Sequence, residues 1–134
     1  MKKYLIAITV GTVLLMVPSM AKDKVTTHQV HFAKETTGST VKGSVKGYES
    51  VLYKLGAKAG QSMRVSIESK KAYFNIYAPG KGLGNEAMFR EGYTGNNYVG
   101  TLPANGTYTI AVYLYRNEAR RGTTAPYTLH IGID

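Results

Sequence analysis

Three arginines lie within the short stretch Arg116-Asn117-Glu118-Ala119-Arg120-Arg121, near the end of the chain. A guanidinium group carries five donors in a rigid fork that fits a carboxylate through two parallel hydrogen bonds. Arg116 and Arg120 are four positions apart, so one helical turn would place both on the same face. We expect this stretch to bind an acidic group of a partner. The alternative is a solvated basic loop, which is the ordinary role of such a run of charges.

Two further stretches have residue types that suit a contact surface. Tyr48 follows Lys46-Gly47 at the junction between two expected strands, and an exposed tyrosine there would be an anchor of the kind enriched at interface hot spots. A buried tyrosine is the alternative. The stretch Thr94-Gly95-Asn96-Asn97-Tyr98 has the composition of a tight turn. Its hydroxyls would reach polar groups in a cleft if the turn protrudes, and otherwise it is an ordinary hairpin turn.

Catalytic and metal-binding arrangements are not indicated. A glycosidase needs two carboxylates that flank one bond, and the acids near the expected strands form no spaced pair: they are Glu49, Glu68, Glu86 and Glu91. The chain has no cysteine, and its three histidines have no nearby acid cluster, which makes a poor metal site. No serine occupies a nucleophile motif. We therefore expect a protein that is not an enzyme and that holds neither a metal nor a cofactor.

The charge of the chain favours anionic partners but does not indicate which class of anionic partner binds. The formal net charge of +9 makes nucleic acid, lipid headgroups, anionic glycans or an acidic protein cleft plausible. Eleven tyrosines could stack on bases. Most of them, however, fall on strand faces or in core patterns, and the cations are scattered. Nucleic acid is therefore not an expected partner.

Residues 1–21 have the pattern of a secretory signal peptide. Lys2 and Lys3 precede the apolar run from Tyr4 to Val17, and Ser19-Met20-Ala21 supplies small residues at a cleavage site. The apolar run is too short to span a membrane, which takes about 20 residues. We expect export, cleavage after Ala21 and a single domain over residues 22–134 with no membrane span.

The elements that must position the contact residues are strands. Apolar residues alternate with polar ones in several short stretches, which is typical of half-buried antiparallel strands. The clearest stripes are Met63, Val65 and Ile67; Tyr108, Ile110, Val112 and Leu114; and Tyr127, Leu129, Ile131 and Ile133. We expect the last two stripes to pair with each other across the loop 116–124 and a first strand to lie at Val30 and Phe32. At Gly43 and Gly47 we expect close backbone approach or a bulge. The pattern predicts an all-β fold, an antiparallel β-sandwich of about eight strands.

Several short motifs resemble those of a known family. They are Lys46-Gly47-Tyr48, Ala59-Gly60-Gln61, Leu102-Pro103-Ala104 and Arg116-Asn117-x-Ala119-Arg120. In these motifs the chain resembles the small periplasmic proteins that inhibit lysozymes of the goose (g) and invertebrate (i) types. The resemblance implies an eight-stranded β-sandwich that plugs the active-site cleft of lysozyme. Arg116 and Arg120, with Asn117 beside them, would pair with acids in the cleft while Tyr48 packs on its rim.

The resemblance favours g-type lysozyme as the partner and leaves i-type second. The i-type inhibitors share a Ser-Gly-x-x-Tyr loop, for which this chain has Thr94-Gly95-Asn96-Asn97-Tyr98. Threonine keeps the hydroxyl but adds a methyl group that would crowd a tight cleft. The functional alternative is a non-catalytic envelope or glycan-binding module. The sequence leaves a homodimer open.

Overall fold

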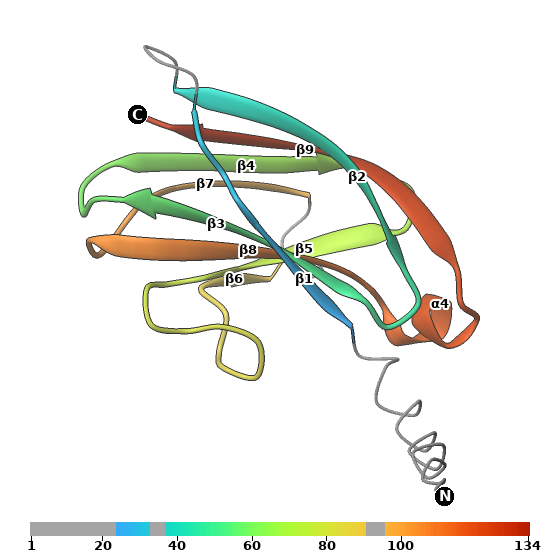
Figure 1. The fold of residues 1–134 in the computed structure, drawn as a ribbon. Helices are drawn as coiled ribbons and strands as arrows, with labels where there is room; N and C mark the ends of the chain where they lie inside the picture. Colours follow the sequence, from blue (N-terminus) through green and yellow to red (C-terminus); the bar gives the residue numbers. More distant parts are fainter. Residues whose placement is uncertain (1–23, 33–36, 91–95) are drawn as a thin grey trace, which may run out of the picture.

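Two β-sheets packed face to face make up the domain in the computed structural model, which describes residues 24–32, 37–90 and 96–134 (Figure 1). The predicted leader over residues 1–21 lies outside these residues. Within the described ranges, no helix is long and apolar enough to cross a membrane. The predicted all-β sandwich is confirmed.

One sheet has five strands and the other has four. In spatial order, the five-stranded sheet consists of β1 (Val25–Gln29), β3 (Ser50–Ala57), β8 (Gly106–Leu114), β5 (Ala72–Tyr77) and β6 (Phe89–Arg90). The four-stranded sheet consists of β2 (Gly38–Lys46), β9 (Thr124–Ile133), β4 (Ser62–Glu68) and β7 (Asn97–Thr101). Neighbouring strands are antiparallel except β1 and β3, which are parallel.

The core lies between the sheets and is formed by the alternating apolar residues. On β4, Met63, Val65 and Ile67 are buried while Arg64 and Glu68 are exposed. Burial of such a stripe is the main favourable term in folding, at about 25 cal/mol per Å² of apolar surface. A Cβ at Gly43 would lie 2.7 Å from the hydroxyl of Tyr127, so the close neighbour of this glycine is a side chain and not the backbone that was expected.

The first strand lies earlier than predicted. β1 covers Val25–Gln29 and pairs in parallel with β3, whereas the sequence indicated a strand at Val30 and Phe32. The backbone N–H of Val30 still donates to the carbonyl oxygen of Lys54 at 2.9 Å. Val30 and Phe32 are partly buried against the core, so their alternation reflects burial beyond the end of the strand.

The expected pairing of the last two stripes is wrong. β8 pairs with β3 and β5, whereas β9 pairs with β2 and β4, so the two strands lie in different sheets. Their apolar stripes meet across the core. The same alternation of inward residues would occur whether the two strands paired in one sheet or faced each other from opposite sheets. The connection between them therefore crosses from one sheet to the other and includes a helical turn, α4 (Arg116–Arg120). The turn between β2 and β3 crosses between the sheets at the same end (Figure 1).

Candidate functional site

The helical turn α4 places Arg116 and Arg120 one turn apart, as their spacing suggested. Tyr115 precedes the turn in an extended conformation, and its carbonyl oxygen accepts from the N–H groups of Glu118 and Ala119 at 3.0 and 2.9 Å. Ala119 is buried and anchors the turn against the core. Gly122, with φ of 73°, follows the end of the turn in the left-handed region, where glycine is favoured.

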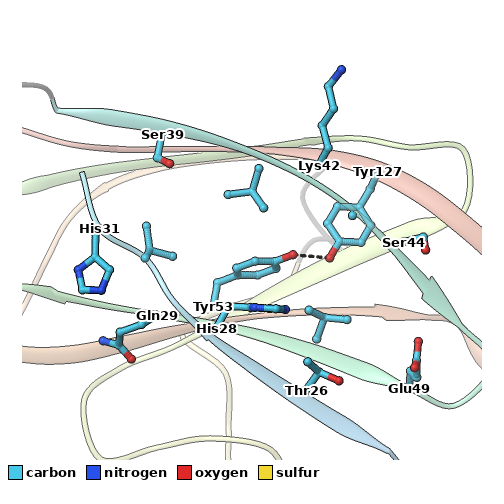
Figure 2. Close-up of a pocket in the computed structure, with 14 residues that line it drawn as sticks. Thr26, His28, Gln29, His31, Ser39, Lys42, Ser44, Glu49, Tyr53 and Tyr127 are labelled. Carbon is cyan, nitrogen blue, oxygen red and sulfur yellow. Dashed lines mark hydrogen bonds between the residues drawn. The ribbon is translucent and has the colours of Figure 1, made fainter. Parts of the chain in front are cut away.

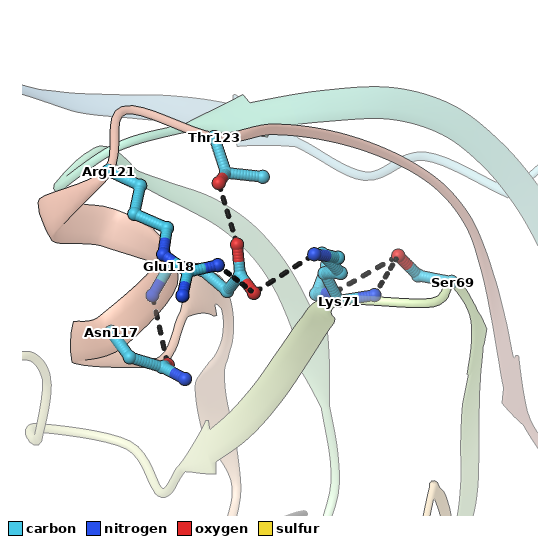
Figure 3. Close-up of polar contacts among 7 residues, drawn as sticks. Ser69, Lys71, Asn117, Glu118, Arg121 and Thr123 are labelled. Carbon is cyan, nitrogen blue, oxygen red and sulfur yellow. Dashed lines mark hydrogen bonds and ion pairs between the residues drawn. The ribbon is translucent and has the colours of Figure 1, made fainter.

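Glu118 ties this turn to the rest of the domain (Figure 3). Its carboxylate accepts a hydrogen bond from the hydroxyl of Thr123 at 2.6 Å and another from the ammonium of Lys71, on the segment before β5, at 2.9 Å. The guanidinium of Arg121 lies 3.8 Å from the same carboxylate. The hydrogen bonds from Thr123 and Lys71, with the nearby charges, hold the pKa of Glu118 below its ordinary value.

The three arginines therefore differ in their contacts. Arg121 is the one that pairs with Glu118. In the described part of the chain, no hydrogen bond or ion pair engages the guanidinium of Arg116 or of Arg120, and both residues are exposed. Two cations that pair with no described residue are therefore available to an acidic group from outside.

The lowered pKa of Glu118 leads to a prediction about stability. A carboxyl group whose pKa is lower in the folded state than in the unfolded state stabilises the fold above its unfolded pKa, near 4.5, and loses that contribution as pH falls through the folded value. We expect Glu118→Gln to be less stable than the parent protein at neutral pH. The difference should shrink as pH falls below about 4.5. Urea unfolding of both proteins between neutral pH and pH near 3 measures it.

The matched control for this prediction is Glu86→Gln, which changes an exposed glutamate on the connection between β5 and β6. Its stability relative to the parent should stay nearly constant over the same range. A difference for Glu118→Gln that is independent of pH would show that the carboxylate charge does not stabilise the turn.

Tyr48 lies in the turn between β2 and β3, next to the arginine-bearing turn. Its side chain is 42% exposed, so the expectation of an exposed aromatic residue is confirmed. Gly47 has φ of 60°, and its N–H donates to the carbonyl oxygen of Thr123 at 2.9 Å, which joins the two connections directly. Tyr48 and Arg116 line one shallow hollow of about 340 Å³. The structure thus brings Tyr48 and Arg116 together at one end of the sandwich.

The Thr94–Tyr98 stretch is not brought into this group within the described residues. Thr94 and Gly95 lie outside them. Tyr98 is on β7, at the edge of the four-stranded sheet, where its partly buried ring packs 5.1 Å from the ring of Phe89. Burial raises the pKa of Tyr98, with a smaller contribution from Tyr108. Tyr98 supports the edge of the core, and it does not line the hollow that Tyr48 and Arg116 share.

A larger hollow of about 550 Å³ lies on another side of the domain, between β1 and β2 (Figure 2). Its lining includes His28, which stacks on Tyr53 with ring centroids 5.4 Å apart. The hydroxyls of Tyr53 and Tyr127 are hydrogen-bonded at 2.5 Å. Burial, together with the hydrogen bond between the Tyr127 and Tyr53 hydroxyls, raises the pKa of Tyr127. None of the candidate contact residues that the structure describes lines this hollow.

Sequence reasoning missed a group of tyrosines beside the arginine-bearing turn. Tyr73 on β5 pairs in register with Tyr113 on β8, and the ring of Tyr115 stacks on that of Tyr73 with centroids 3.9 Å apart. The available signal was the alternation of Tyr113 and Tyr115 with the inward residues Val112 and Leu114. That alternation places the two tyrosines on the outer face of the five-stranded sheet.

The most similar known proteins in two comparisons belong to one group. No family model matches the chain. A curated protein of Escherichia coli K12, "Inhibitor of g-type lysozyme", is 31% identical over 104 residues, which is 78% of each chain. The crystal structure of PliG of Aeromonas hydrophila, described as a periplasmic inhibitor of g-type lysozyme, is 45% identical and covers 84% of this chain and 99% of its own, with a TM-score of 0.80. The PliG of Salmonella Typhimurium, with the same description, is 30% identical over 81% of this chain and 98% of its own, with a TM-score of 0.66.

Proposed function

The chain belongs to the family of periplasmic inhibitors of g-type lysozyme, and we propose that it inhibits such an enzyme by inserting Arg116 and Arg120 into the substrate cleft. Tyr48 packs against the rim of the cleft in this arrangement. The chain is not itself an enzyme, in keeping with its family. Inhibition is competitive, because the arginines occupy the place of the glycan and pair with carboxylates that the enzyme needs for hydrolysis.

The observation that carries the proposal is that the charged side chains at α4 have two different roles. Lys71 and Arg121 each lie against the carboxylate of Glu118, and these contacts hold the turn. Arg116 and Arg120 remain exposed, and no group among the described residues pairs with their guanidinium groups. Holding the backbone of the turn in place before binding reduces the entropy lost on association. The cations are thus presented on a turn that is already ordered.

The position of Tyr48 supports the same proposal. The hydrogen bond from Gly47 to Thr123 fixes the tyrosine-bearing turn to the connection that carries the arginines. Tyrosine and arginine are among the residues enriched at interface hot spots. An exposed tyrosine that lines the same hollow as Arg116 is suited to cover the edge of a cleft that receives the arginines.

Export fits this role, because the relatives are described as periplasmic and peptidoglycan is the substrate that lysozyme attacks. In the proposal the leader over residues 1–21 directs the chain to the periplasm and is removed after Ala21. Residues 22–134 then form the inhibitory domain and protect the cell wall from lysozyme that enters.

A panel of lysozymes tests the proposal. Protein purified from the periplasm should block lysis of cell-wall suspensions by g-type lysozyme at micromolar concentration or below, and c-type lysozyme is the control enzyme. Equal inhibition of an i-type lysozyme would add a second enzyme class to its targets. Retention on insoluble peptidoglycan with no inhibition of g-type or i-type enzyme would contradict the proposal and favour a glycan-binding module.

A further inference from the structure

Exposed apolar side chains gather next to the arginine-bearing turn. The described residues expose five large hydrophobic side chains: Val25, Tyr48, Leu83, Val99 and Tyr115. Three of these, Tyr48, Leu83 and Tyr115, lie at or beside the hollow that Arg116 lines. Clustering of this kind on a surface with a hollow marks an interaction site more often than single exposed residues do.

The hollow is lined by residues from separate segments of the chain. Tyr48 comes from the turn between β2 and β3, Leu83 from the connection between β5 and β6, Tyr113 from β8, and Arg116 from α4. The outer face of the five-stranded sheet lines it as well, at Asn75 and Ala111. Its volume of about 340 Å³ exceeds that of a single large side chain, so it has room for one protruding side chain and part of its backbone.

A stack of tyrosines extends the wall of this hollow. Tyr113 lines the hollow, and its ring centroid lies 6.3 Å from that of Tyr73 and 6.1 Å from that of Tyr115. Tyr115 is 39% exposed although it stacks closely on Tyr73. Stacked rings have few rotamers to lose, so they offer a large contact area at low entropic cost.

The charges at the hollow argue against a cationic occupant. The carboxylate of Glu49, which lines it, accepts the backbone N–H of Lys46 at 2.9 Å and lies 3.8 Å from the ammonium of Lys24. The nearby carboxylate of Glu118 is held by Thr123 and Lys71. Both acids are thus engaged within the chain, and Arg116 adds a positive charge at the edge. An apolar side chain is the occupant that this surface fits.

We infer that the hollow between Tyr48, Leu83 and Tyr113 is a socket for a protruding apolar side chain on the rim of the g-type lysozyme cleft. This rests on the proposed function. Arg116, Arg120 and Tyr48 alone offer a small contact, whereas a stable complex buries about 800 Å² on each partner. When the arginines enter the cleft, its rim must meet the adjoining surfaces, and the hollow adjoins Arg116. Each protein then inserts side chains into the other: the arginines enter the cleft of the enzyme, and the side chain on its rim enters the hollow.

Truncation of the socket wall tests this inference. Leu83→Ala and Tyr115→Ala should each weaken inhibition of g-type lysozyme about tenfold or more, as expected for residues at the centre of an interface. The matched control is Val99→Ala on β7, which removes an exposed apolar side chain from the other sheet and should change inhibition less than about twofold. Leu83→Asp places a charge at the socket and should weaken inhibition further. Thermal unfolding of each variant verifies that the fold is retained.

The outcomes separate the socket from the arginine plug. If Leu83→Ala and Tyr115→Ala inhibit as strongly as the parent while Arg120→Ala inhibits more weakly, the socket is overturned. The proposal that the arginines enter the cleft is then still supported. If the parent protein does not inhibit g-type lysozyme, both proposals fail. If chitotetraose alone shifts the NMR signals of the Tyr113 and Tyr115 rings and Leu83→Ala still inhibits fully, the hollow binds a saccharide and the inference is wrong.

Discussion

Replacing Arg116 or Arg120 with alanine should weaken inhibition of g-type lysozyme by roughly 30-fold or more for each residue. Removal of one member of a desolvated charge pair costs about 2–5 kcal/mol, because the remaining charge stays buried without a partner. Neither arginine has a partner within the described part of the chain, so the fold should keep its stability. Inhibition constants from a lysis assay, with a thermal unfolding curve for each variant, measure the two effects separately.

Arg121→Ala is a closely matched control, since it removes the same side chain one position further along. The guanidinium of Arg121 is exposed and lies 3.8 Å from the carboxylate of Glu118, and an ion pair with such an exposed partner contributes at most about 1 kcal/mol. Its loss should therefore change inhibition little. Arg120→Lys keeps the charge but not the fork of donors, so it should restore only part of the affinity. Equal losses for all three alanine variants would indicate a general charge effect and would contradict the specific roles of Arg116 and Arg120.

Phe74→Ala should be among the most destabilising single substitutions in the domain. The side chain of Phe74 is fully buried, and its ring lies 5.3 Å from that of Phe89. Truncation of a buried phenylalanine costs about 3–5 kcal/mol through lost burial and the cavity that remains. Domains of this size are stable by only about 5–15 kcal/mol, and the chain has no cysteine to form a disulfide. We expect a fall of roughly 15 °C in Tm, measured by circular dichroism.

Val99→Ala is the control for this prediction, because it truncates an apolar residue that is 70% exposed. Its change in stability should lie within about 0.5 kcal/mol of zero. A small effect of Phe74→Ala would mean that the space left by the ring is filled by movement of the sheets, and that the core is less closely packed than its burial indicates.

The fold class could be predicted from alternation alone, but the pairing of the strands could not. The stripes of β8 and β9 show which residues face inward, and this holds whether the strands are hydrogen-bonded or lie in opposite sheets. The choice depends on the path of residues 116–123, where Ala119 is buried and Glu118 reaches Thr123 and Lys71. The contact between Glu118 and Lys71 joins residues 47 positions apart, and a local pattern does not report it.

The sequence predicted which residues belong to the candidate site better than it predicted how they are arranged. The spacing of Arg116 and Arg120 indicated a shared face, and α4 provides it. The sequence did not decide that Arg121 is the arginine with a structural partner, because Glu118 lies within three positions of all three arginines. It also could not separate Tyr98, which packs on Phe89, from Tyr48, which is exposed. Burial at the end of a strand depends on what the other sheet places there.

Both connections of the proposed binding end pass from one sheet to the other, and the hydrogen bond between Gly47 and Thr123 links them. The relative position of Tyr48 and Arg116 therefore depends on how the two sheets are placed over each other. A shift of one layer over the other would separate the tyrosine from the cations even with every strand intact. Inhibitory activity is thus a sensitive measure of how the layers are aligned, and heat should abolish activity no later than it melts the strands.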